Sequence, residues 1–104
     1  MTVTLSTHVL DAVGGVPAAN LAVVLSGSGT DIAATATDAD GRIRWDVEID
    51  PGDYRLSFAT GEWATTLGRP TFYPAVDLHV TIADGHTHVA LLLSAYSYTT
   101  YKGS

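Results

Sequence analysis

The chain opens on Val3-Thr4-Leu5-Ser6-Thr7-His8-Val9-Leu10-Asp11, a stretch in which more apolar and more polar side chains alternate. Successive side chains of a β-strand point to opposite faces, so the odd-numbered positions share one face and the even-numbered positions the other. The odd-numbered face is the more apolar one and is the predicted core side. His8 is therefore expected on the face turned away from the core.

The same period of two recurs in short blocks along the rest of the chain. The predicted strands cover residues 3–10, 21–25, 32–37, 42–48, 54–58, 76–82, 86–93 and 96–101. Turn residues separate them, among them the runs Gly14-Gly15-Val16-Pro17, Asp38-Ala39-Asp40-Gly41 and Asp84-Gly85. One short helix is expected from Glu62 to Leu67, with Thr60 as its N-cap. Eight strands and one helix predict an all-β sandwich or barrel that forms a single domain, residues 1–104.

Composition narrows the possible partners and compartments. The 104 residues include 5 Lys and Arg against 11 Asp and Glu, a net charge of -6, which argues against a nucleic-acid partner. No cysteine is present, so disulfides and thiolate metal sites are excluded. No apolar run is long enough to span a membrane, and the start of the chain does not resemble a signal peptide. We expect a soluble, unprocessed, cytoplasmic protein, and a charged fraction of only 15% suggests that part of its surface is buried in an oligomer.

Three predicted strands place basic side chains on faces away from the core. They carry His8, Arg42 and the pair His86 and His88, whose alternate neighbours Val89 and Leu91 form the apolar face. If these faces converge, a neutral imidazole can take a proton from water while a guanidinium stabilises negative charge on a carbonyl oxygen. Clustered positive charge would also lower each histidine pKa and attract a planar anion. This chemistry is hydrolysis of an activated carbonyl without a metal.

Each of these residues also has a simpler interpretation. His79 is expected to be a solvated surface residue, and Arg42 alone would be taken for a solvated residue after a turn. His8, His86 and His88 could together bind zinc, but a His-x-His pair is weak evidence, so neither a metal nor a cofactor is predicted. The tyrosines near the end could pack along an edge strand or at a subunit interface; they are Tyr96, Tyr98 and Tyr101.

Four segments carry a resemblance to a known family, in order and spacing. They are Leu5 to Asp11, Thr37 to Arg42, Gly68 to Pro74 and His86 to Ser104. In them the chain resembles the 5-hydroxyisourate hydrolases of the transthyretin-like family. The resemblance implies a transthyretin-like (prealbumin-like) sandwich of two four-stranded sheets with one short helix. It also implies a homotetramer, a dimer of dimers whose sheets enclose a central channel.

The resemblance further implies a reaction and a set of site residues. The reaction is hydrolysis of 5-hydroxyisourate to 2-oxo-4-hydroxy-4-carboxy-5-ureidoimidazoline in urate degradation, by opening the N1–C6 bond. The implied catalytic residues are His8, Arg42 and His88, and which histidine is the base stays open. The implied substrate-binding residues are Tyr101, Lys102, Gly103 and Ser104, with His86 close to the substrate.

Some positions depart from the family pattern, and two other functions remain open. Lys102 replaces the usual arginine and loses its planar pair of donors, Thr87 replaces an aromatic residue, and Ala90 and Ala95 stand where proline is common.

Transthyretin itself, a hormone carrier, lacks the closing tetrapeptide and the histidines at the positions of His8 and His88. The alternatives are a non-catalytic carrier of a small aromatic ligand in the channel and an inert structural sandwich.

Overall fold

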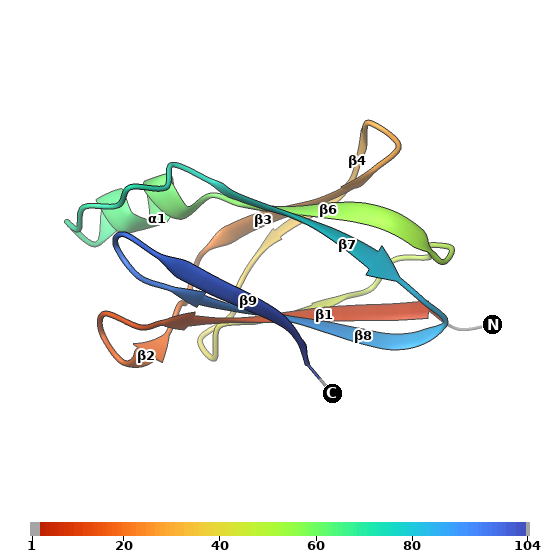
Figure 1. The fold of residues 1–104 in the computed structure, drawn as a ribbon, viewed down its shortest axis with the longest axis horizontal. Helices are drawn as coiled ribbons and strands as arrows, with labels where there is room; N and C mark the ends of the chain where they lie inside the picture. Colours follow the sequence, from red (N-terminus) through yellow and green to blue (C-terminus); the bar gives the residue numbers. More distant parts are fainter. Residues whose placement is uncertain (1–2, 104) are drawn as a thin grey trace.

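The protein folds as two facing β-sheets with one helix at one end (Figure 1), in a computed structural model that describes residues 3–103. Its elements are β1 (Val3–Asp11), β2 (Val16–Pro17), β3 (Ala22–Gly27), β4 (Thr30–Ala36), β5 (Arg42–Trp45), β6 (Gly52–Phe58), α1 (Thr60–Thr66), β7 (Val76–Ile82), β8 (Gly85–Leu93) and β9 (Tyr98–Gly103). Within that range no helix is long and apolar enough to cross a membrane.

The predicted sandwich of two sheets with one short helix is confirmed, with one difference in strand number. The first sheet runs β2-β1-β8-β9 and the second β4-β3-β6-β7. β5 also pairs with β1, so the first sheet has five strands rather than four. The strand that was not predicted is β2, which lies in the predicted turn Gly14-Gly15-Val16-Pro17. β5 pairs with Leu5 to His8, and β2 pairs with Leu10 and Asp11, so the two short strands lie end to end along one edge of β1.

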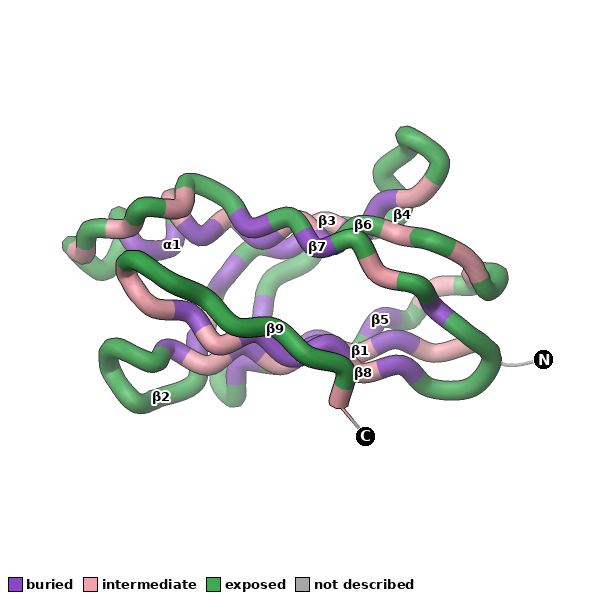
Figure 2. The backbone as a smooth tube through the Cα atoms, viewed as in Figure 1, coloured by how far each residue is buried: buried purple, intermediate pink, exposed green. Residues whose placement is uncertain are grey.

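The faces predicted from alternation are those observed. In β1 the side chains of Leu5, Thr7 and Val9 are buried, and in β8 those of Val89 and Leu91 are buried as well. The apolar ones among them belong to one core cluster with residues of the second sheet such as Leu56 and Phe58. Figure 2 shows buried stretches in both layers of the sandwich. Burying each large aliphatic side chain favours folding by about 1.5–3 kcal/mol. The opposite face of the first sheet is left free of core packing.

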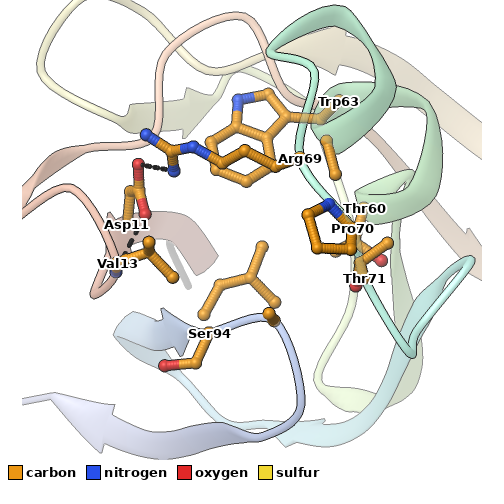
Figure 3. Close-up of a pocket in the computed structure, with 11 residues that line it drawn as sticks. Asp11, Val13, Thr60, Trp63, Arg69, Pro70, Thr71 and Ser94 are labelled. Carbon is orange, nitrogen blue, oxygen red and sulfur yellow. Dashed lines mark hydrogen bonds and ion pairs between the residues drawn. The ribbon is translucent and has the colours of Figure 1, made fainter.

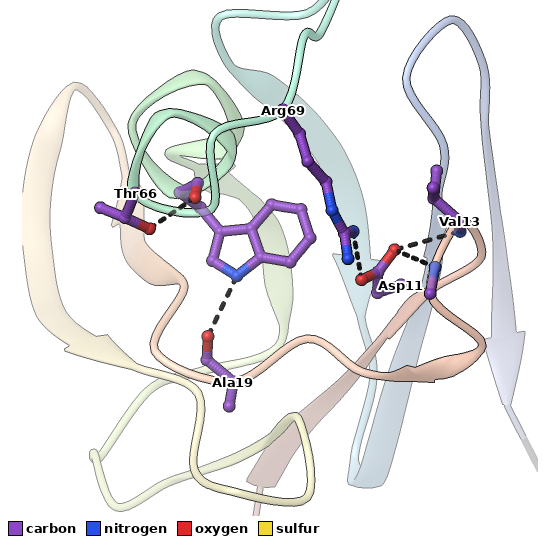
Figure 4. Close-up of polar contacts among 7 residues, drawn as sticks. Asp11, Val13, Ala19, Thr66 and Arg69 are labelled. Carbon is purple, nitrogen blue, oxygen red and sulfur yellow. Dashed lines mark hydrogen bonds and ion pairs between the residues drawn. The ribbon is translucent and has the colours of Figure 1, made fainter.

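The helix begins two residues earlier than predicted, and its expected cap is absent. α1 starts at Thr60, and the N-cap is Ala59, which makes no side-chain capping bond. The Thr60 hydroxyl instead donates to the carbonyl of Tyr73, 2.6 Å away, because Thr60 is buried where the chain returns past the helix. The Trp63 indole N–H donates to the carbonyl of Ala19 at 3.0 Å (Figure 4), which holds this short helix against the loop before β3.

Most strand boundaries differ from the predictions by one or two residues, and the two over-long predictions, for β5 and β9, have a clear physical reason. β5 ends at Trp45 rather than continuing to Glu48, because its pairing with β1 ends at Leu5 opposite Trp45. β9 begins at Tyr98 rather than Tyr96, since the N–H of Ser94 donates to the carbonyl of Ser97 and closes a turn there. Alternation alone continues past both points and gives no sign of either end.

Candidate active site

Parallel pairing of the first and eighth strands brings the basic residues together. β1 and β8 lie side by side, with Thr4 opposite His86, Ser6 opposite His88 and His8 opposite Ala90. On the other side of β1, Arg42 of β5 lies opposite His8. Paired residues project to the same face, so the outward face of this sheet carries the imidazoles of three histidines and the guanidinium of Arg42. The convergence on which the predicted chemistry depends is observed within one chain.

The turn before β5 fixes where Arg42 enters the sheet. The carboxylate of Asp38 accepts from the backbone N–H groups of Asp40 and Arg42, both at 2.9 Å. Gly41 has a φ of 74°, and a Cβ there would lie 2.4 Å from the carbonyl oxygen of Val9. Only glycine satisfies both demands, so the Asp-Gly-Arg sequence places the guanidinium beside His8 through backbone geometry.

A chain of short hydrogen bonds links two of the histidines. The Ser6 hydroxyl lies 2.7 Å from Nδ1 of His88 and 2.8 Å from Nε2 of His86. Nδ1 of His86 in turn lies 2.6 Å from the Thr4 hydroxyl. His88 is therefore hydrogen-bonded to Ser6 through Nδ1. His86, which is exposed, contacts a hydroxyl of β1 with each of its two ring nitrogens.

These side chains border a hollow with a strongly basic rim. It measures about 440 Å³ and is lined by Ser6, Thr7, Asp38, Arg42, Ile43, Arg44, His86 and His88. Partial burial, followed by the nearby charges of His8, His86 and Arg42, lowers the pKa of His88 below its usual 6.5. His88 is thus a neutral imidazole near neutral pH and can accept a proton. Arg44, on the same exposed face of β5 as Arg42, adds a second guanidinium to the rim.

The closing segment divides between the two faces of its strand. Tyr101 pairs with Ala90 and Gly103 pairs with His88, so both belong to the face that carries the histidines. A Cβ on Gly103 would lie 2.5 Å from Cδ2 of His88, which shows how closely the strand lies against that ring. Lys102 pairs with Val89 and lies on the opposite face. Ser104 lies outside the described residues.

Comparison with known proteins places the chain in a family. The HIUase/Transthyretin family pattern matches residues 5–103. The chain belongs to this family. A probable 5-hydroxyisourate hydrolase of Schizosaccharomyces pombe is 40% identical over 112 residues, which cover 96% of this chain and 90% of that protein.

Two solved members of the HIUase/Transthyretin family share the fold. The 5-hydroxyisourate hydrolase of Klebsiella pneumoniae superimposes with a TM-score of 0.91 at 35% identity, covering 98% of this chain and 94% of that one. The transthyretin of Sparus aurata gives a TM-score of 0.88 at 34% identity, covering 95% of each chain. Proteins with different names therefore share this fold, so the function has to be inferred from the side chains of the site.

A second pocket lies at the helix end of the sandwich and contains the carboxylate of Asp11 beside Arg69 (Figure 3). It measures about 180 Å³ and is mostly apolar, between α1, the segment that follows it and the ends of β1 and β8. Its carboxylate, Asp11, already accepts from the N–H groups of Val13 and Gly14 and from Arg69 (Figure 4). Because this carboxylate and the guanidinium of Arg69 are engaged with each other, we assign this pocket a structural role.

Sequence reasoning missed the hydroxyls of the site. Alternation did place Thr4 and Ser6 on the same face as His8, but their partners lie 80 or more residues away in sequence. Only the strand register shows that Ser6 contacts both His86 and His88. As for a metal, no three His, Cys, Asp or Glu side chains in residues 3–103 are arranged to hold one.

Proposed function

We propose that this chain hydrolyses 5-hydroxyisourate by opening its N1–C6 bond, which gives 2-oxo-4-hydroxy-4-carboxy-5-ureidoimidazoline. The observation that carries the proposal is His88, an imidazole held neutral beside Arg42 at the edge of a basic hollow. The hydrolase names of the S. pombe and K. pneumoniae relatives support the same reaction. The transthyretin of Sparus aurata shares the fold, but a protein that only carries a ligand needs no neutral base beside a guanidinium.

The reaction needs one base and one charge-stabilising group. In the proposed sequence, Nε2 of His88 takes a proton from water as the water oxygen bonds to C6. The guanidinium of Arg42 donates to the carbonyl oxygen on which negative charge develops. When the C6–N1 bond breaks, His88 returns the proton to N1, and the carboxylic acid formed at C6 ionises in water. No step in this sequence requires a metal or a cofactor.

His8 then has a supporting part. It lies opposite Arg42, and both are basic groups that contribute to the lowered pKa of His88. We propose that His8 binds the substrate beside Arg42, which leaves His88 as the base. The overall charge of the protein is negative, so this cluster of basic groups is a local attraction for a planar anion.

The substrate-binding roles proposed for the closing segment have unequal support. Tyr101 and Gly103 share the face of the hollow, and His86 lines it. Lys102 lies on the other face of β9, beside Val80, Thr81 and Thr87, so its proposed contact with substrate depends on the family resemblance alone. The proposed contact of Ser104 with substrate also depends on the family resemblance alone.

A homotetramer is proposed as the working assembly. The hollow is open to solvent in one chain, and a facing copy would shelter it from water. The exposed Tyr98 and Tyr101 on the edge strand β9 provide surface for association. Light scattering after size-exclusion chromatography should give four chains per particle, and a strictly monomeric active enzyme would contradict the proposal. A cytoplasmic location remains a prediction, which imaging of a tagged chain in its own cell would check.

The reaction itself is tested with freshly made 5-hydroxyisourate. Urate and urate oxidase generate it, and its decay is followed by ultraviolet absorbance with and without the protein. We expect acceleration by the wild type and a loss of about 100-fold or more in His88→Ala, which removes the base. The matched control is His79→Ala, because His79 is an exposed strand histidine on the second sheet. No acceleration by correctly folded wild type would favour the carrier function instead.

A further inference from the structure

We propose that Ser6 and Gly103 are positioning residues that clamp the imidazole of His88 from its two sides, so that the ring presents Nε2 to the reacting water. The inference deepens the proposed function and depends on it for its catalytic meaning. The geometry of the clamp itself is independent of any substrate.

The two sides of the ring are held by different strands. The hydroxyl of Ser6, on β1, lies 2.7 Å from Nδ1. On the other side, Gly103 of β9 is so close that a Cβ would lie 2.5 Å from Cδ2, 3.2 Å from Cγ and 3.4 Å from the Cβ of His88. Nδ1 and Cδ2 flank the ring on opposite sides of Cγ, so these two contacts leave the edge with Cε1 and Nε2 uncovered. The rotation of the ring is therefore limited by a hydrogen bond on one side and by backbone on the other.

Ser6 also decides which ring nitrogen carries the proton. A hydroxyl has one proton to donate, and the Ser6 oxygen contacts both Nδ1 of His88 and Nε2 of His86. When Ser6 donates to His86, its oxygen accepts from Nδ1–H of His88, and Nε2 of His88 keeps a free lone pair. When Ser6 donates to His88, the proton of that imidazole sits on Nε2, which is then unable to act as a base. The first arrangement is the one that catalysis by Nε2 requires.

His86 and Thr4 can complete the first arrangement. A neutral His86 that accepts at Nε2 has its proton on Nδ1, and the Thr4 hydroxyl lies 2.6 Å from that nitrogen and can accept the proton. The proton positions of four side chains are thus linked in series from Thr4 through His86 and Ser6 to His88. The basic groups whose positive charge would lower the pKa of His88 are His8, His86 and Arg42. His86 acts in this scheme through Ser6 rather than by contact with substrate.

The clamp is tested first with Ser6→Ala. We expect kcat for 5-hydroxyisourate to fall about tenfold to 100-fold with KM changed less than about twofold, because a wrong tautomer removes the base while the binding groups remain. Ser6→Thr keeps the hydroxyl and should restore most of kcat. Ser57→Ala is the matched control, since Ser57 is a half-buried strand serine that donates to Asp77 on the other sheet.

Nitrogen NMR of the imidazoles gives a readout that is independent of catalysis. Wild type at a pH where His88 is neutral should show its proton on Nδ1, and Ser6→Ala should move it wholly or partly to Nε2. A wild-type His88 protonated on Nε2, or a Ser6→Ala protein with unchanged tautomer and unchanged kcat, overturns the inference. If wild type fails to hydrolyse 5-hydroxyisourate while the tautomer still depends on Ser6, the proposed function fails and the clamp stands.

The glycine side of the clamp is tested with Gly103→Ala. The added Cβ would displace the His88 ring, so we expect kcat to fall about tenfold or more with cooperative unfolding retained. Gly52→Ala is the control, because Gly52 also lies in a strand and a Cβ there meets nothing closer than 3.8 Å. Full activity in Gly103→Ala, with the His88 ring resonances unmoved, would overturn this part of the inference.

Discussion

The carboxylate of Asp11 should stabilise the fold in a way that depends on pH. Asp11 is only 2% exposed, its Oδ1 accepts two backbone N–H groups at 3.0 Å, and its Oδ2 accepts from Nη1 of Arg69 at 2.5 Å. Burial alone would raise the pKa of Asp11. The N–H of Gly14, the guanidinium of Arg69 and the N–H of Val13 outweigh burial and hold the pKa below its usual 3.8.

The informative change is Asp11→Asn, which keeps one carbonyl oxygen for the backbone donors but turns an amide NH₂ towards Arg69. A hydrogen bond to a charged group contributes about 1.5–3 kcal/mol, and the Arg69 side chain is 32% exposed, which weakens the pair. We therefore expect the free energy of unfolding to fall by about 1–2 kcal/mol. Asp11→Ala, which also deprives Val13 and Gly14 of their acceptor, should cost about 3 kcal/mol.

Urea unfolding measured across a pH series gives the test. A group with a lowered folded-state pKa stabilises above its unfolded pKa, and that contribution is lost as the pH falls through the folded value. The difference between wild type and Asp11→Asn should thus be constant from about pH 5 to 8 and shrink below about pH 4. Exposed Asp31→Asn, the control, should stay within about 0.5 kcal/mol of wild type. A difference as large at pH 3 as at pH 7 would refute the reasoning.

Three further predictions concern the core and the site. Thr37→Val should lower the free energy of unfolding by about 2–3 kcal/mol in urea, because the buried hydroxyl bonds the carbonyl of Ala18 and the N–H of Leu21, whereas exposed Thr35→Val should be nearly neutral. Leu91→Ala should cost about 3–5 kcal/mol in the same assay, since Leu91 is fully buried, and a cost under about 1 kcal/mol would contradict the packing. The rate of 5-hydroxyisourate hydrolysis should fall with falling pH as His88 is protonated, with a midpoint below 6.5, and a midpoint at or above that value would exclude His88 as the base.

Alternation predicted this fold well where a strand has one buried and one open face. In β1 and β8 the burial of Leu5, Val9 and Leu91 follows the period of two, and it correctly left His8 and His88 outside the core. Alternation failed where pairing with a neighbouring strand determines whether a strand forms and where it ends. β2 lies within a predicted turn, and β5 ends early, because each pairs with only part of β1.

The candidate site was predictable in its residue types but not in its connections. Histidine and arginine on open faces were visible in the sequence, and the resemblance to a family gave them roles. The contact of Ser6 with His86 and His88 could not be predicted, because it depends on parallel pairing of strands 82 positions apart in sequence. The opposite face assigned to Lys102 likewise follows from the register of β9 and not from its place in a motif.

The packing of the buried face of β1 also fixes the alignment of the site on its open face. The hydroxyl of Thr7, fully buried, donates to the carbonyl of Val89 at 2.7 Å, and these two residues are paired in the register of β1 and β8. A slip of one residue would turn every side chain of β1 to the other face, burying His8 and breaking this bond, so the core strongly disfavours it. The same register sets Ser6 against His88. Catalytic alignment and core packing are therefore fixed by one pairing, and the alternative functions could arise by changing open-face side chains without disturbing the core.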